Sequence, residues 1–157
     1  MINKVTVTDS VQLDVPAEQA LAVLWDVKTL SLYEPKVDAM RVTPQTEERG
    51  TYAIKGRFAG FPWRGIFSYI LNPRGFHSEL LKGPPSVRMN GGFVVTPRRA
   101  DQCCITHYER YQFSSWLALL APLIRIYVAW AIKKELRGLA GIISEKSRLP
   151  LIANYGA

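Results

Sequence analysis

Several side chains that could orient a small ligand lie in the middle of this sequence, within segments that otherwise carry large apolar residues. They are hydroxyl groups and one guanidinium, from Tyr52, Tyr69, Ser78, Thr106, Tyr108 and Arg110. In an apolar cavity, a few such groups fix the pose of a ligand that bears a carbonyl, a carboxylate or a phenol. Alternatively, the tyrosines only pack and extend their hydroxyls to water at the rim. As a cluster, these residues favour the lining of a ligand-binding cavity.

The sequence lacks the residue patterns of common catalytic and cofactor sites. It contains no GxSxG nucleophile elbow, no phosphate-binding glycine loop and no dinucleotide-binding fingerprint. Cys103 and Cys104 are adjacent, so they point to opposite faces of a strand and are poorly placed to pair or to share one ion. His77 and His107 fall on the outward face of the strands described next, which argues against a histidine general base. We therefore predict no metal and no cofactor, and we favour a chain that is not an enzyme, with a cyclase or dehydratase as the alternative.

The elements that would position these side chains are antiparallel strands. Turn sequences divide residues 37–110 into about six of them: EERG at 47–50, AGFP at 59–62, NPRG at 72–75, KGPP at 82–85 and PRRAD at 97–101. We predict a register that pairs Phe58 with Trp63 and Val95 with Cys104, which collects the large apolar side chains on one face. The outward face then carries Lys55, Arg57, Arg64, His77, Glu79, Arg88, Asn90, His107 and Glu109. A single bulge would invert part of this arrangement.

The segment before these strands combines a strand with two short helices. Apolar residues alternate with polar ones from Val5 to Val15, which is the period of a half-buried strand. The stretch PAEQALAVLWDV then has helical spacing, with a proline in its opening turn, and predicts a helix to about Asp26. Residues 28–33 predict a second short helix that ends before Pro35.

The segment after the strands predicts one long helix. From Trp116 to about Ser147 the apolar residues recur with the helical period, and Pro122 would kink the helix. Its wide apolar stripe must be covered, and the apolar face of the sheet has the matching length. We assign residues 1–148 to a single domain and residues 149–157 to an irregular tail.

This order of elements resembles that of the START-like, Bet v 1-like (SRPBCC) superfamily, which includes polyketide cyclases. The resemblance covers essentially the whole chain, and its most telling stretches are VPAEQALAVLWDVKTLSLYEP at 15–35, GTYAIKGRFAGFPWRG at 50–65, and ITHYERYQF followed by the long helix. It implies a helix-grip fold of the α+β class: a curved seven-stranded antiparallel sheet wrapped around a long C-terminal helix, with two short helices after the first strand. It also implies a cavity between sheet and helix, where members bind lipids, sterols, polyketides, quinones or aromatic compounds. Element order supports fold far better than activity.

The predicted inward face and the long helix together define the candidate ligand-binding residues. They are Tyr52, Ile54, Trp63, Phe67, Tyr69, Ser78, Met89, Phe93, Thr106, Tyr108, Arg110 and Val128. Among charged residues, Asp9 and Arg110 both break the apolar side of the terminal strands, which the family fold places side by side. One hypothesis is a buried ion pair between them near the cavity, since an inward charge requires a partner. The other is a bulge that turns either charge to solvent.

Composition and charge limit the partners of this chain. Apolar residues make up 48% of the sequence and charged residues 21%, as in an ordinary globular protein. The net charge of +7 favours acidic surfaces, but the basic residues are scattered, so we predict no nucleic-acid partner. Residues 1–10 lack the apolar core of a secretion signal, which favours a cytoplasmic location. The oligomeric state is left open.

One apolar segment raises the question of membrane contact. Residues 116–132 are interrupted only by Pro122 and Arg125, but they fall short of the about 20 residues that a spanning helix needs. We predict a buried amphipathic helix, and keep a peripheral contact with membrane as an alternative.

Three functions fit these observations. The first is a non-catalytic binder or carrier of a small hydrophobic molecule, such as a lipid, a polyketide, a quinone or an aromatic compound. The second is a polyketide cyclase or dehydratase, a lyase-type enzyme that would need acid and base groups in the cavity, where the register offers only the tyrosines, Arg110 and Asp9. The third is a membrane-associated lipid or quinone chaperone whose basic surface and Trp116–Trp130 segment meet anionic lipid.

Overall fold

One open, curved sheet of seven antiparallel strands frames the molecule. The computed structural model describes the backbone of residues 2–155 and the surroundings of the side chains of residues 2–147. The strands are β1 (Ile2–Leu13), β2 (Ala39–Pro44), β3 (Arg49–Phe58), β4 (Phe61–Asn72), β5 (Gly75–Lys82), β6 (Val87–Arg99) and β7 (Gln102–Ser114), in the spatial order β1-β7-β6-β5-β4-β3-β2. The chain therefore crosses from one sheet edge to the other between β1 and β2. This crossing uses α1 (Ala17–Trp25), the 3-10 turn η1 (Val27–Thr29) and α2 (Leu30–Tyr33).

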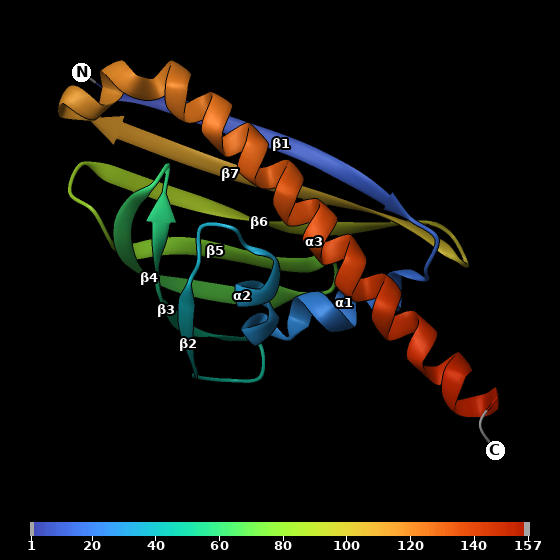
Figure 1. Ribbon diagram of the computed structural model, residues 1–157. Coiled ribbons are helices and arrows are strands. Elements are labelled where there is room, and N and C mark those ends of the chain that lie inside the picture. The colour runs from blue at the N-terminus through green and yellow to red at the C-terminus, as the bar shows by residue number, and fades with distance from the viewer. Residues whose placement is uncertain (1, 156–157) are drawn as a thin grey trace.

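A long helix, α3 (Ala121–Tyr155), crosses the sheet after the 3-10 turn η2 (Ser115–Leu120). Figure 1 shows α3 running diagonally over the sheet near β1 and β7, while β2, β3 and β4 curl forward on the other side. The predicted helix-grip architecture is confirmed. Pro122 lies in the first turn of α3, where its missing N–H is not needed, so it begins the helix and does not kink it. Residues 149–155 continue the helix, although the sequence predicted an irregular tail there, and residues 156–157 lie outside the described part.

The core lies between the inner face of the sheet and one stripe of α3. That stripe consists of Val128, Ala131, Ile132, Leu136, Leu139 and Ile143, all buried. Their spacing of three and four residues puts them on one side of the helix, where they cover the apolar side of the strands. Arg125, on the exposed side of α3, donates to the carbonyl of Thr6 at 3.1 Å and so fastens the helix to the edge strand β1.

The β3–β4 hairpin is tighter than predicted but keeps its faces. Ala59 and Gly60 form a two-residue turn with φ values of 50° and 84°, the positive values that such turns require. Phe58 therefore pairs with Phe61, two residues away from the predicted partner Trp63. A shift of two residues leaves every side chain on its predicted face.

The β6–β7 hairpin differs from its prediction by one residue, and this shift reverses the faces of β7. Arg99 pairs with Gln102 and Pro97 with Cys103, so Arg98 is an unpaired bulge residue and Val95 lies opposite Ile105. The predicted inward positions of Thr106, Tyr108 and Arg110 are therefore wrong, as are the outward positions of His107 and Glu109.

The hypothesis of an ion pair between Asp9 and Arg110 fails for the same reason. Arg110 lies opposite Thr6 in the β1–β7 ladder, is exposed, and stacks over the ring of Tyr108 at 5.0 Å. Asp9 is half-buried and accepts from the backbone N–H of Ser10 at 2.8 Å. Within residues 2–147 no ion pair joins the two charges, and the bulge turns Arg110 to solvent.

Candidate functional site

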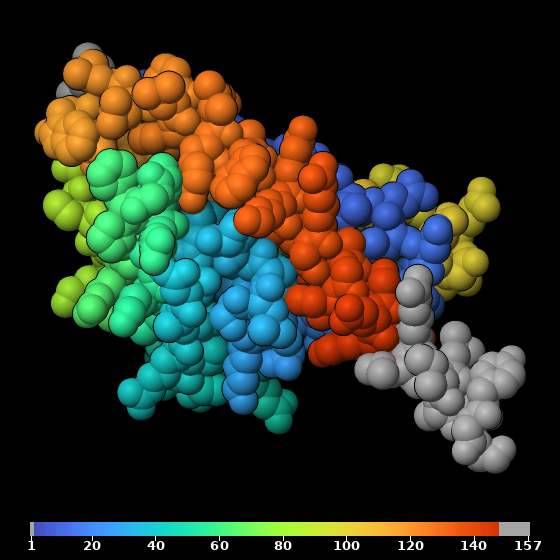
Figure 2. Space-filling model, in the orientation of Figure 1, coloured from blue at the N-terminus to red at the C-terminus, as the bar shows by residue number. Residues whose placement is uncertain are grey.

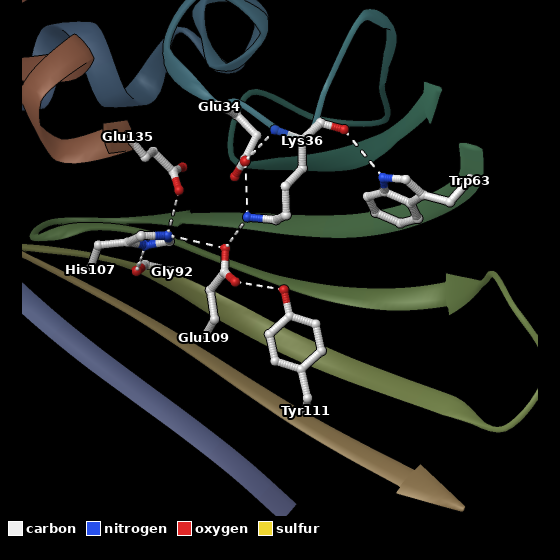
Figure 3. A network of polar contacts seen from close by, with 8 residues as sticks. All are labelled: Glu34, Lys36, Trp63, Gly92, His107, Glu109, Tyr111 and Glu135. Carbon is white, nitrogen blue, oxygen red and sulfur yellow. Dashed lines mark hydrogen bonds and ion pairs between the residues drawn. The ribbon is translucent and has the colours of Figure 1, made fainter. Parts of the chain in front are cut away.

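Five ionisable side chains meet in the core, at the point where the sheet, α3 and the segment after α2 come together (Figure 3). The Nζ atom of Lys36 lies 2.9 Å from Glu34 Oε1 and 2.9 Å from Glu109 Oε1. The Nε2 atom of His107 lies 2.9 Å from Glu135 Oε2 and 3.4 Å from Glu109 Oε1. All five side chains are buried, so the charges interact in a medium that screens them weakly. We call these five residues the polar network.

A close approach of two backbones places Glu34 and Lys36. A Cβ atom at Gly56 of β3 would lie 1.8 Å from the carbonyl oxygen of Lys36, so only glycine lets this segment lie against the strand. The indole of Trp63 donates to the same carbonyl at 3.2 Å. The Glu34 carboxylate accepts from the backbone N–H of Lys36 at 2.9 Å, which ties the two residues together.

Strand alternation and the helix stripe place the remaining members. His107 and Glu109 are two residues apart on β7 and point inward together, and Tyr111, next on the same face, donates to Glu109 Oε2 at 2.6 Å. Glu135 occupies a position within the apolar stripe of α3 and is fully buried. The polar network therefore joins the loop after α2, the sheet and α3.

The pKa shifts in the polar network follow from burial and from its charge pairs. Burial alone would raise the pKa of Glu109, but Lys36 and His107 hold it well below its usual range. Burial alone would lower the pKa of Lys36, but Glu109 and Glu34 raise it well above its usual value. Burial likewise would lower the pKa of His107, and Glu135 and Glu109 raise it to about 10. Lys36 and His107 are therefore cationic at neutral pH.

Glu34 shifts in the opposite direction from Glu109. Burial, followed by the negative charge of Glu135, raises the pKa of Glu34 to about 8, against the attraction of Lys36. At neutral pH its carboxyl group is then mainly protonated. Two cations, Lys36 and His107, face the two other carboxyl groups, so the buried charges balance.

Hydrogen bonding in the polar network is incomplete at Glu135. His107 donates through Nδ1 to the carbonyl of Gly92 at 2.8 Å, since a carbonyl oxygen only accepts. Its Nε2 pairs with Glu135 Oε2 at 2.9 Å without the alignment of a hydrogen bond, and apart from a side-chain contact with the protonated Glu34, the carboxylate oxygens of Glu135 have no donor among the described residues. The site thus places a protonated acid, Glu34, near a buried carboxylate with free acceptor capacity. Such groups ordinarily have a partner, whether protein, water or ligand.

Two cavities adjoin this site. A small one of about 40 Å³ borders the polar network and has room for roughly three water molecules. A second one of about 540 Å³ opens between the β3–β4 turn, the β5–β6 loop, the end of β7 and the η2–α3 junction, and no charged side chain lines it among the described residues. Trp63 and Met89 line both cavities, so the two cavities are neighbours.

The predicted ligand-binding residues divide into three groups. The small cavity is lined by Tyr52, Ile54, Trp63, Phe67, Ser78, Met89 and Phe93, of which Trp63 and Met89 also line the large one. Tyr69 and Val128 are buried but line neither cavity. Thr106, Tyr108 and Arg110 lie on the outer face because of the bulge at Arg98. There Thr106 contacts Ser10 Oγ at 2.9 Å, and Tyr108 contacts His77 Nδ1 at 2.9 Å.

The polar network as a whole was not predicted from the sequence. Glu135 gave a usable signal, because it is a charge within an apolar helical stripe between Ile132 and Leu139. His107 and Glu109 gave none, since their inward position depends on a bulge that turn residues do not specify.

The polar network is also the described group that comes nearest to a metal site. Glu34, His107, Glu109 and Glu135 each offer a ligand atom within 4.8 Å of the others. The ammonium of Lys36 already binds two of these carboxyl groups, so a divalent cation would have to displace it. The prediction of no metal stays a prediction.

Comparison with solved structures identifies the fold. The Zhui aromatase/cyclase from Streptomyces sp. R1128 superposes with a TM-score of 0.83 at 16% identity, over 93% of this chain and 97% of that one. A START superfamily protein from Mycobacterium smegmatis gives 0.74 at 12% identity, over 89% and 97%. Norcoclaurine synthase from Thalictrum flavum gives 0.67 at 13% identity, over 92% and 88%.

The chain has the START-like, Bet v 1-like helix-grip fold. No protein-family model and no curated protein matches the sequence. At these identities the likeness establishes the fold alone, and the function has to be argued from the site.

Proposed function

We propose that this START-like chain binds or carries a small hydrophobic molecule in its 540 Å³ cavity, with a polar end of that molecule directed toward the polar network. The observation that carries the proposal is a large cavity without charged lining among the described residues, next to a small cavity that borders the polar network and shares Trp63 and Met89 with it. The volume lies within the about 300–1,000 Å³ that is usual for small-molecule sites.

The apolar walls supply the main driving force for binding. Aromatic and aliphatic residues such as Phe58, Tyr111, Phe113 and Tyr127 line the cavity. Removing apolar surface from water contributes about 25 cal/mol per Å², so binding requires no reactive residue. Structures of similar fold include an aromatase/cyclase and a START superfamily protein, which supports a ligand-binding role in general terms.

The polar network favours ligands with a small uncharged head. Charges already balance among its five residues, so a charged head would leave an unpaired charge in the core. A hydroxyl can donate to Glu135, and a carbonyl can accept from the protonated Glu34. The expected class is therefore a largely apolar molecule, such as a lipid, quinone, polyketide or aromatic compound, with a hydroxyl or carbonyl at one end.

Binding of the uncharged fluorescent probe N-phenyl-1-naphthylamine tests the proposal. We expect saturable binding to the wild-type protein and at least a tenfold loss in Ile124→Trp, because this side chain lines the cavity and a larger ring there would fill it. The matched control is Leu32→Trp, at a position that is 71% exposed on α2. Equal binding by wild type and Ile124→Trp would refute the cavity as the binding site. Native mass spectrometry of gently purified protein would identify a natural ligand.

A second candidate function, an enzyme of the cyclase or dehydratase class, is favoured by one observation: Glu34 is a protonated acid at neutral pH beside the buried carboxylate of Glu135. In such a reaction, Glu34 would protonate the carbonyl oxygen of the substrate, and Glu135 would accept the proton from the adjacent carbon. The resulting enol then attacks or eliminates within the cavity. The roles expected from the sequence for Arg110 and Asp9 do not apply, because neither borders the polar network.

Exchange of the α-protons of 2-tetralone in deuterated water, followed by proton NMR, tests this candidate. We expect acceleration by the wild-type protein and a loss of roughly 10²–10⁴-fold in Glu34→Gln, the size of a general acid–base contribution. Glu34→Gln should still bind N-phenyl-1-naphthylamine. Equal exchange rates with and without protein would contradict the enzymatic candidate and leave ligand binding as the proposed function.

A further inference from the structure

We propose that an exposed apolar strip on η2 and the first half of α3 docks this protein on the surface of an anionic lipid bilayer. The strip consists of Trp116, Leu119, Leu123, Ile126 and Trp130, and we call it the docking strip. This proposal rests on the surface itself and holds whether or not the cavity carries a ligand.

The exposure of the docking strip is the first observation. Its five side chains are between 51% and 68% exposed, although each is large and apolar. They recur at intervals of three and four residues, so they share one side of the helical segment, opposite the stripe that packs on the sheet. A contiguous apolar surface of this kind on a monomer usually marks an interaction site.

The strip also continues into the mouth of the large cavity. Trp116 and Leu123 belong to the strip and also line the cavity. Phe61, which is 75% exposed at the start of β4, lies outside the strip and lines the same cavity. Figure 2 shows side chains of η2 and early α3 (orange) on the outer surface beside those of the β4 region (green). A bilayer that covers the strip would therefore also cover the cavity mouth.

The basic residues in this segment favour anionic lipid as the partner of the docking strip. The segment from Ser115 to Lys134 contains no acidic residue and three basic ones, Arg125, Lys133 and Lys134. The Nζ atom of Lys134 lies 5.1 Å from the ring centre of Trp130, at one end of the strip, and Trp116 stands at the other end. Tryptophan and lysine together are typical of helices that lie in the membrane interface. A second copy of the same segment would instead bring like charges together.

The arrangement supports a helix that lies on the membrane and does not cross it. Residues 115–147 are long and apolar enough to span a bilayer by composition. The opposite side of α3, however, packs on the sheet and contributes Glu135 to the polar network. Crossing would remove that side from the core and expose a charged residue to lipid.

Vesicle flotation tests the proposal on the full chain. We expect binding to mixed phosphatidylcholine–phosphatidylglycerol vesicles at low salt, and much weaker binding to phosphatidylcholine alone. Leu119→Ser/Ile126→Ser should lose roughly tenfold or more in affinity, because these side chains belong to the strip but do not line the cavity. Lys133→Glu/Lys134→Glu should lose at least about fivefold per residue. The matched control, Leu32→Ser, should bind like wild type.

Two further measurements make the result decisive. Binding of N-phenyl-1-naphthylamine should be unchanged in Leu119→Ser/Ile126→Ser, which confirms that the variant is folded and separates a failure of docking from a failure of the cavity proposal. Light scattering reports the oligomeric state. Absent binding to anionic vesicles, unchanged binding by the double serine variant, or a wild-type dimer that the variant converts to monomer would each overturn the proposal.

Discussion

Lys36 is a lysine with almost no exposure to water, and the polar network depends on its charge. It bridges Glu34 and Glu109 with two contacts of 2.9 Å. A buried ion pair contributes little net stability compared with apolar residues, but removal of one partner leaves the other charge unpaired in the core.

We therefore expect Lys36→Met to lower the free energy of unfolding by about 3–5 kcal/mol, measured by urea denaturation. Lys36→Met/Glu109→Gln should be less destabilised than the sum of the two single variants, because it removes the uncompensated carboxylate as well. Additive effects of the two substitutions would mean that Lys36 and Glu109 are not energetically coupled.

At the scale of residues, the sequence predicted part of the cavity lining but did not predict the polar network. Trp63, Met89 and Phe93 were predicted to line a cavity, and the structure places them there because turn sequences fix strand parity up to β6. Glu34 and Lys36 lie in the short irregular segment after α2, where no periodicity indicates which side chains turn inward. Their burial depends on Gly56, whose missing side chain cannot be connected to Lys36 without coordinates.

At the scale of elements, the contact of the α2–β2 segment with β3 positions two of the five residues of the polar network, Glu34 and Lys36. Gly56→Ala should lower the melting temperature markedly and weaken the site, because the new Cβ atom meets the Lys36 carbonyl and one backbone must move. Gly141→Ala on α3 is the control. A Cβ atom there meets nothing within 4 Å, so the change should stabilise the helix by about 0.5–1 kcal/mol. Equal melting temperatures for Gly56→Ala and wild type would contradict this account.

The order of the elements was predictable from the sequence. The orientation of β7 and the end of α3 were not. Alternation, turn sequences and the long helical period predict every strand and helix of the fold in order, because each carries a local signal. The orientation of β7 depends on whether Arg98 joins the ladder, and the turn residues Pro97 and Asp101 do not encode that choice. The continuation of α3 to Tyr155 was missed because Pro150 lies in this segment, and a proline ordinarily ends or breaks a helix.

At the scale of the whole molecule, the polar network makes stability depend on pH. Folding raises the pKa of Glu34 from 4.5 to about 8 and that of His107 from 6.5 to about 10, so the native state binds more protons than the unfolded chain over both ranges. Stability therefore decreases as pH rises from about 4.5 to 10. Glu109 has a lowered pKa, so its contribution is present above 4.5 and is lost in more acidic solution.

Thermal melts across this range should give the highest melting temperature near pH 5. Glu34→Gln should flatten the decrease between about pH 4.5 and 8, and His107→Gln the decrease between about 6.5 and 10. A wild-type melting temperature that stays constant from pH 5 to 10 would show that these two groups do not change protonation on folding.

The cytoplasmic location expected from the sequence remains a prediction.

Alternate residues of β7 form two sets of side chains, and the bulge at Arg98 decides which set faces the interior. If Arg98 paired with Cys103, the imidazole of His107 and the carboxylate of Glu109 would leave the interior, and Thr106, Tyr108 and Arg110 would replace them. The geometry of a distant hairpin thus decides whether β7 presents an acid and a base or hydroxyls and a guanidinium to the interior, with no substitution among these residues. A protein engineer could alter the chemistry of this cavity most economically by editing the length of that hairpin.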